Sequence, residues 1–115
     1  MANDFKNAIA QNVSNSAGGT TIYTTPANKT SIMLELDIAN TTTNVVEASV
    51  EVLDSSVSAS AWRYLVKNAP VPSGGSLMVI AGQKIVLEAG DKVRVTSSAA
   101  NVMDAVAAIL EDVNS

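Results

Sequence analysis

The 115-residue sequence contains no cysteine and no histidine. Without cysteine the chain can form neither disulfide bonds nor a thiolate nucleophile, so packing alone must hold the fold. Without histidine it lacks the usual general base near neutral pH and, together with the missing cysteines, the ordinary zinc ligands. These absences favour a non-enzymatic protein with no catalytic residues, no bound cofactor and no metal site of its own. Only carboxylates remain for such chemistry, and they leave a metal possible only at a junction between subunits.

Aromatic side chains are also rare, being limited to Phe5, Tyr23, Trp62 and Tyr64. The remaining apolar residues are mostly small and aliphatic, whereas each aromatic side chain covers a large apolar area. We therefore expect Trp62 and Tyr64 to anchor the core. The alternative is an exposed aromatic pair on a strand, which would stack on sugar rings or nucleobases.

Positive charge is scarce as well, with 7 Lys and Arg against 11 Asp and Glu. The chain has no Lys/Arg cluster of the kind that binds a phosphate backbone, so we expect no direct contact with nucleic acid. The longest apolar run, Ala105–Leu110, is far shorter than the roughly 20 residues of a membrane-spanning helix, and we expect no membrane contact. No apolar stretch follows a basic tip at the N-terminus, which favours synthesis in a cytoplasm without a secretory signal.

Two neighbouring segments alternate apolar and polar residues, the pattern of half-buried strands. The polar linker Asn40–Asn44 joins residues 31–40 to residues 45–54, so we predict an antiparallel hairpin. Leu34, Leu36 and Val50 are its expected core anchors. The complete inward sets are Ile32, Leu34, Leu36 and Ile38 in the first segment, and Val46, Ala48, Val50 and Val52 in the second.

A third alternating segment, residues 61–68, places Trp62 and Tyr64 on the same face as Val66. Pro70 and Pro72 follow it and predict a corner, because proline has no N–H for a sheet ladder. Shorter strands are expected at residues 76–80, 84–88 and 91–97, with turns at Gly82 and at Ala89–Gly90.

The last segment, residues 102–113, fits either a helical stripe or a strand, and the β-rich context leads us to predict a strand. Strands of this length with turn signals every eight to twelve residues are typical of sandwiches. We therefore predict an all-β protein, an antiparallel β-sandwich or jelly-roll-like single domain over residues 20–115.

Residues 1–19 are rich in Asn, Ser and Ala and end in Gly18–Gly19, so we interpret them as an N-terminal arm. A short helix from Asp4 to about Asn12, capped by Asn3, is one possible form, but it is too short to be stable without a surface to dock on. Phe5 and Ile9 share one side and are candidate inter-subunit contacts. The alternative is a frayed terminus that packs locally.

Two pairs of carboxylates, Glu35 with Asp37 and Glu47 with Glu51, each lie on one face of a predicted strand. Paired carboxylates flank the scissile bond in glycosidases. Exposed charged residues are far more often a solvated outer face. We take all four as further candidate contacts between subunits.

Three segments, in their order and spacing, resemble small virion structural proteins of tailed bacteriophages. Residues 21–30 are similar to the opening strand and Pro-Ala-Gly-Lys-Thr-like turn of that family, with Asn28 in place of the usual glycine. Residues 69–77 resemble its proline corner, and residues 84–91 its strand-turn unit. The likeness covers about residues 20–110.

This resemblance implies a non-enzymatic building block of a phage particle that is present as symmetric copies. The chain would act as a capsid decoration or cement protein that stabilises the head. Its partners would be further copies of itself and other virion proteins such as the major capsid protein, and its location the virion. The alternative is a tail, neck or fibre-associated module with a receptor- or sugar-binding surface.

Overall fold

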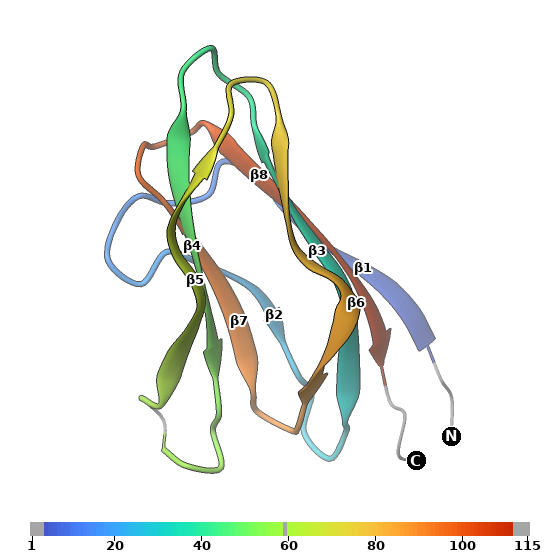
Figure 1. Cartoon of the computed structure of the whole chain (residues 1–115). Helices are drawn as coiled ribbons and strands as arrows, with labels where there is room; N and C mark the ends of the chain where they lie inside the picture. The colour runs from blue at the N-terminus through green and yellow to red at the C-terminus, as the bar shows by residue number, and fades with distance from the viewer. Residues whose placement is uncertain (1–3, 59, 112–115) are drawn as a thin grey trace.

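The structure is a computed structural model that describes residues 4–58 and 60–111, without the side chains of residues 81–83. In this part of the chain every regular element is a β-strand. The strands form two four-stranded sheets that lie face to face (Figure 1). They are β1 (Asp4–Ala10), β2 (Thr20–Thr24), β3 (Ser31–Asn40), β4 (Val46–Leu53), β5 (Trp62–Val71), β6 (Ser76–Leu87), β7 (Lys92–Ser97) and β8 (Met103–Glu111).

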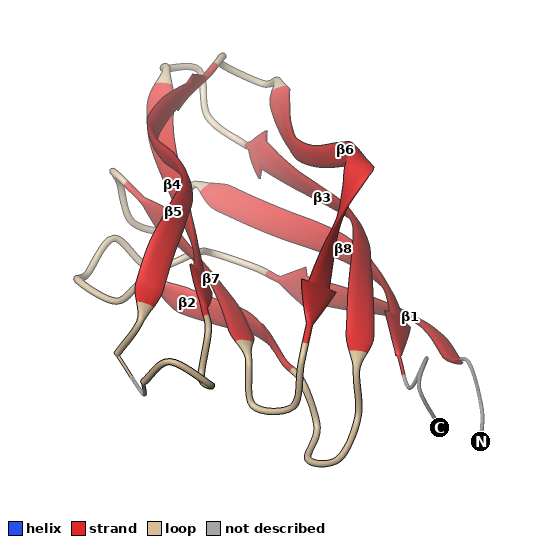
Figure 2. Cartoon of the chain, turned by 60° about the horizontal axis from the view of Figure 1, so that its bottom comes forward, coloured by secondary structure: helices blue, strands red, loops and turns tan. Residues whose placement is uncertain are grey.

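The strand order is that of a jelly roll. Sheet I has the order β1-β8-β3-β6 and sheet II the order β2-β7-β4-β5, and all neighbouring strands are antiparallel. The pairs β1/β8, β2/β7, β3/β6 and β4/β5 are nested along the chain, as in one long antiparallel ribbon that has been rolled up. The predicted all-β sandwich, including its closing C-terminal strand, is confirmed (Figure 2).

The predicted hairpin of residues 31–40 and 45–54 is wrong, because β3 belongs to sheet I and β4 to sheet II. The buried Asn40 holds the connection as a wide corner. Its Nδ2 donates to the carbonyl oxygens of Asn44 and Val71, at 2.6 and 3.0 Å, and its Oδ1 accepts the N–H of Thr42 at 3.0 Å. Such side-chain bonds satisfy the backbone while the chain crosses between sheets.

The N-terminal segment is a strand and not the helix considered from the sequence. β1 pairs with β8 at all seven positions from Asp4 to Ala10. Val13 then enters the core, fully buried, and donates its N–H to the carbonyl oxygen of Met103 at 2.8 Å. The edge of β8 supplies backbone hydrogen bonds that a marginal one- or two-turn helix would lack. Asn3, the expected cap, lies outside the described residues.

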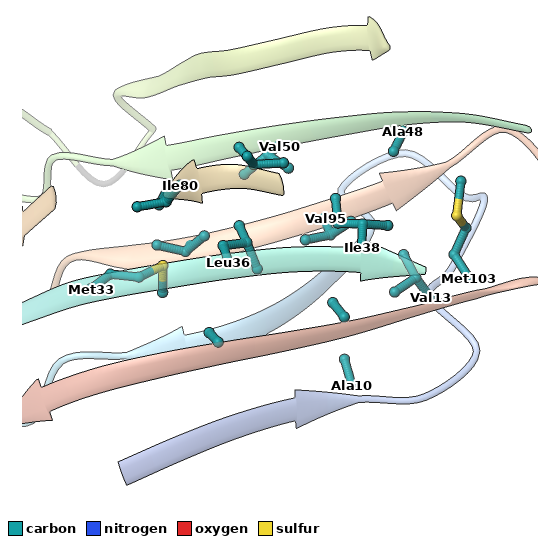
Figure 3. Close-up of a cluster of buried hydrophobic side chains, with 14 of the residues drawn as sticks. Ala10, Val13, Met33, Leu36, Ile38, Ala48, Val50, Ile80, Val95 and Met103 are labelled. Carbon is teal, nitrogen blue, oxygen red and sulfur yellow. The ribbon is translucent and has the colours of Figure 1, made fainter. Parts of the chain in front are cut away.

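Aliphatic side chains from both sheets fill the space between them (Figure 3). Leu36 and Val50, two of the predicted core anchors, are fully buried, as are Met33 and Ile109. The buried set contains no aromatic residue; Tyr23 packs against it from one end while partly exposed. The core of the described residues is therefore aliphatic.

Leu34 is only partly buried, contrary to its prediction as a core anchor, because β3 contains a bulge at this position. Met33 and Glu35 pair with two consecutive residues of β8, so Leu34 is the extra residue between them. A bulge of this kind shifts the alternation of side chains by one position. Before it Met33 is inward, and after it Leu36 and Ile38 are.

A second bulge, in β5, places Trp62 and Tyr64 outside the core. Tyr64 and Val66 pair with consecutive residues of β4, which leaves Leu65 as the extra residue. Val66 packs against the core, whereas Tyr64 is 52% exposed and Trp62 is partly exposed on the outer side of sheet II. The prediction that Trp62 and Tyr64 anchor the core is therefore wrong.

Of two predicted interruptions between strands, the proline corner begins later than expected, at residues 72–75, and the turn at Gly82 is absent. β5 continues through Pro70 to Val71, which an edge strand tolerates because one side of its backbone is unpaired. β6 passes through the expected turn at Gly82 without a break. Gly82 lies in a bulge instead. Met33 pairs with Ile85 and Glu35 with Ala81, so one residue of β3 faces three residues of β6 between these pairs.

Candidate functional site

The four predicted contact carboxylates do not form a single site. Glu35 and Asp37 lie on β3 and point outward from sheet I, whereas Glu47 and Glu51 lie on β4 and point outward from sheet II. Each acidic pair keeps its common face, as the alternation predicted. The two pairs occupy opposite sides of the sandwich because their strands belong to different sheets.

Glu51 is engaged within the chain on the outer face of sheet II. Arg94 of β7 donates to its carboxylate through Nε at 3.0 Å and through Nη2 at 3.1 Å, a bidentate ion pair. The same guanidinium lies over the ring of Trp62, 3.8 Å from its centre. Glu51 therefore orients the cation that covers Trp62. Tyr64, with Lys67 Nζ 5.3 Å from its ring centre, is the more open of the two aromatic side chains.

The outer face of sheet I carries five exposed, large apolar side chains, which we call the apolar face. They are Phe5 (76% exposed), Ile9 (70%), Val86 (63%), Met78 (59%) and Val106 (46%). Cross-strand pairing arranges them in two rows across all four strands, namely Phe5-Leu110-Ile32-Val86 and Ile9-Val106-Asp37-Met78. Asn7, Ala108 and Glu35 form a further row between these two. Large apolar side chains exposed together on one sheet face mark an interaction surface more often than chance exposure does.

Four of the six predicted contact residues lie on the side of sheet I that carries the apolar face, although they belong to separate segments of the sequence. Phe5 and Ile9 come from β1, and Glu35 and Asp37 come from β3, with β8 between the two strands. Beside Phe5 a hollow of about 260 Å³ opens against Asn7 of β1 and the adjoining residues of β8. The face is thus largely apolar, with two carboxylates near its middle.

A carboxylate that sequence analysis did not select is buried near the end of sheet I. Glu111 is 3% exposed, accepts a hydrogen bond from the Tyr23 hydroxyl at 2.6 Å and forms an ion pair with Lys6 Nζ at 2.8 Å. The bond from Lys6, then that from Tyr23, holds the pKa of Glu111 below its ordinary value. Burial, followed by the bond to Glu111, raises the pKa of Tyr23 to about 12.

The signal that could have found Glu111 is the alternation of β8. Met103, Ala105, Ala107 and Ile109 are inward, and the next inward position is Glu111. A carboxylate at an inward position needs donors around it. The cluster ties β1, β2 and β8 together, and we assign it a role in holding the N-terminal strand in place.

Asp54, Glu88 and Asp91 bring carboxylate oxygens within 4.8 Å of one another and are the described residues best placed to hold a cation. The oxygens of Asp91, however, already accept bonds within the chain. Oδ1 accepts from the N–H and hydroxyl of Ser55, both at 2.9 Å, and Oδ2 accepts from the N–H of Glu88 at 3.0 Å. The bond from Glu88 closes the turn between β6 and β7, and the bonds from Ser55 tie that turn to the loop after β4.

Comparison with protein-family models, curated proteins and solved structures found no match to this chain. Among the described residues, no helix has the length and apolarity needed to span a bilayer.

Proposed function

We propose that this chain is a non-enzymatic structural protein of a tailed-phage virion, a capsid decoration protein that binds the head as symmetric copies. The apolar face carries this proposal. Five large apolar side chains exposed on one sheet face cost a free domain solubility and are expected to be covered by a protein partner. Glu35 and Asp37 within the face favour a partner surface that combines apolar side chains with Lys or Arg.

The fold supports the proposal without deciding it. Jelly rolls are found in viral capsid domains, but also in lectins and in cupins, so the topology alone does not assign a function. Metalloenzymes with this fold bind their metal through side chains such as histidine, and histidine is absent from this sequence. The candidate functions that agree with the residues are those of binding and assembly.

One of the segments that resemble phage proteins, residues 21–30, contains a turn with a left-handed backbone conformation. Asn28, which stands where the family has glycine, adopts a left-handed backbone with φ of 63° in the turn between β2 and β3. Asparagine is among the few residues other than glycine that adopt this conformation readily. The departure from the family pattern is thus compatible with the same turn.

Decoration would stabilise a shell by adding many weak contacts that act together. Each copy contributes a modest interface, and symmetric repetition multiplies the effect on the particle. The major capsid protein is the partner that we propose for the apolar face.

Co-sedimentation of the purified chain with undecorated shells tests this assignment. Met78→Lys and Val86→Lys place a charge within the apolar face at exposed positions and should abolish binding while leaving the fold intact. Val57→Lys, at a loop position that is 68% exposed and outside this face, is the matched control and should bind like the wild type. Equal binding by all three variants would contradict the proposal.

Tyr64 favours a second candidate, a tail, neck or fibre-associated module that binds a receptor or sugar. Its exposed ring lies on the outer face of sheet II, opposite to the apolar face. Exposed aromatic rings stack on sugars, although one side of the neighbouring Trp62 ring is already covered by Arg94. Quenching of tryptophan fluorescence by glycans, lost in Tyr64→Ala, would support this candidate.

A further inference from the structure

The two sheets end in four edge strands, of which β1 is the least protected. Sheet I ends at β1 and β6, and sheet II at β2 and β5 (Figure 1). Proteins guard such edges with bulges, prolines and charged side chains, because an open edge pairs with other strands. The pairings of β2, β5 and β6 with their neighbours are all interrupted by register shifts, and β5 also contains Pro70.

β1, in contrast, is a regular strand. Its seven consecutive pairs with β8 show no register shift, and it contains neither proline nor glycine. Its one cationic side chain, Lys6, does not guard the edge, since its Nζ is bound to Glu111 of β8 at 2.8 Å. The opposite edge of β1 is paired with no strand among the described residues.

We propose that β1 is a self-association edge, on which the β1 strand of a second copy pairs antiparallel about a two-fold axis through Asn7. This register is the one in which all seven residues overlap. Phe5 of each copy then lies opposite Ile9 of the other, and the two Asn7 side chains lie opposite each other. An interface of this kind is isologous, with the same patch contributed by both copies.

The side chains make this register self-complementary. Phe5 and Ile9 are 76% and 70% exposed, and each would cover the other across the axis as an aromatic and a β-branched residue. Asp4 and Lys6 have opposite charges, and Glu111 neutralises Lys6, so the edge carries no block of like charge. The two copies of sheet I would become one continuous sheet, and their apolar faces one larger surface.

Cysteine cross-linking tests the register directly, because the chain has no cysteine of its own. Oxidised Asn7→Cys should form a disulfide-linked dimer, since the two Cβ atoms face each other across the axis. Phe5→Cys and Ile9→Cys should each form no disulfide-linked dimer alone and should cross-link when mixed in equal amounts. Val57→Cys, at an exposed loop position, is the control for random collision.

Sedimentation of the full-length chain over a concentration series supplies a second readout. Asn7→Lys places like charges opposite each other on the axis and should weaken dimerisation by roughly tenfold or more. An equal mixture with Asn7→Asp should restore the dimer, because the charges are then opposite. Circular dichroism should show that these variants, changed at an exposed position, remain folded.

The inference does not depend on a virion role, because it is tested on the purified chain alone. A monomer at every concentration, without cross-linking of Asn7→Cys, would overturn it and leave the edge to a strand of another protein. A dimer that survives Asn7→Lys but is lost in Val86→Lys would also overturn it, and would indicate stacking of the apolar faces.

Discussion

Glu111 offers the sharpest test of how the N-terminal strand is held. Glu111→Gln keeps the size of the side chain and removes its charge, and with it the ion pair to Lys6 at 2.8 Å. Hydrogen bonds to charged groups contribute roughly 1.5–3 kcal/mol, more than neutral ones. Because Lys6 is half exposed and can return to water, we expect the variant to lose about 2 kcal/mol of unfolding free energy at pH 7, near the low end of that range.

The stability difference between wild type and Glu111→Gln should depend on pH in a defined direction. The folded state holds the pKa of Glu111 below its ordinary value of 4.5, so its stabilisation is fully present above that pH and is lost as the pH falls through the folded pKa. The difference between wild type and Glu111→Gln should therefore be constant near neutrality and shrink below about pH 4.5. A carboxylate without this environment would show no such change.

Urea unfolding followed by circular dichroism at pH 7 and at pH 3 measures both quantities. Glu47→Gln, which removes the same charge from an exposed position, is the matched control and should change stability by less than about 0.5 kcal/mol. A Glu111→Gln variant as stable as this control at pH 7 would refute the reasoning. So would a deficit that is the same at both pH values.

Three further predictions test the strand register, a tight turn and Tyr23. Leu36→Ala should cost about 2–5 kcal/mol in urea unfolding and Leu34→Ala clearly less, because only Leu36 is fully buried; equal losses would contradict the bulge. Gly19→Ala should cost more than Gly74→Ala by thermal melting, since both have positive φ but only at Gly19 would a Cβ collide with the backbone of β7. Tyrosinate absorbance should show a component near pH 12 that Tyr23→Phe removes, and stability should fall as the pH rises from 10 toward 12.

The fold class could be predicted from the sequence, whereas the register of single residues could not. Alternation located β3 and β4 and placed Leu36 and Val50 inward. A bulge adds one residue without a distinctive sequence signal, so the alternation at Leu34 and at Tyr64 could not reveal that a side chain had changed faces. The size of Trp62 and Tyr64 favours burial, but the bulge at Leu65 places both side chains outside the core.

The sequence also could not predict which strands pair, although it did predict part of the exposed surface. A polar linker such as residues 40–44 fits a hairpin or a crossing between sheets equally well, and the side-chain bonds of Asn40 decide between them. Phe5 and Ile9 share a face in a helix and in a strand, because a spacing of four residues does so in both. Their common side could therefore be predicted even though the helix was wrong.

The copy number of this chain in purified particles of its proposed source phage tests the central claim most directly. Quantitative mass spectrometry would compare it with the major shell protein. A capsid decoration protein predicts a ratio near that of the shell protein. A handful of copies per particle would contradict decoration and favour the tail or neck, and absence from the particles would contradict a virion role altogether.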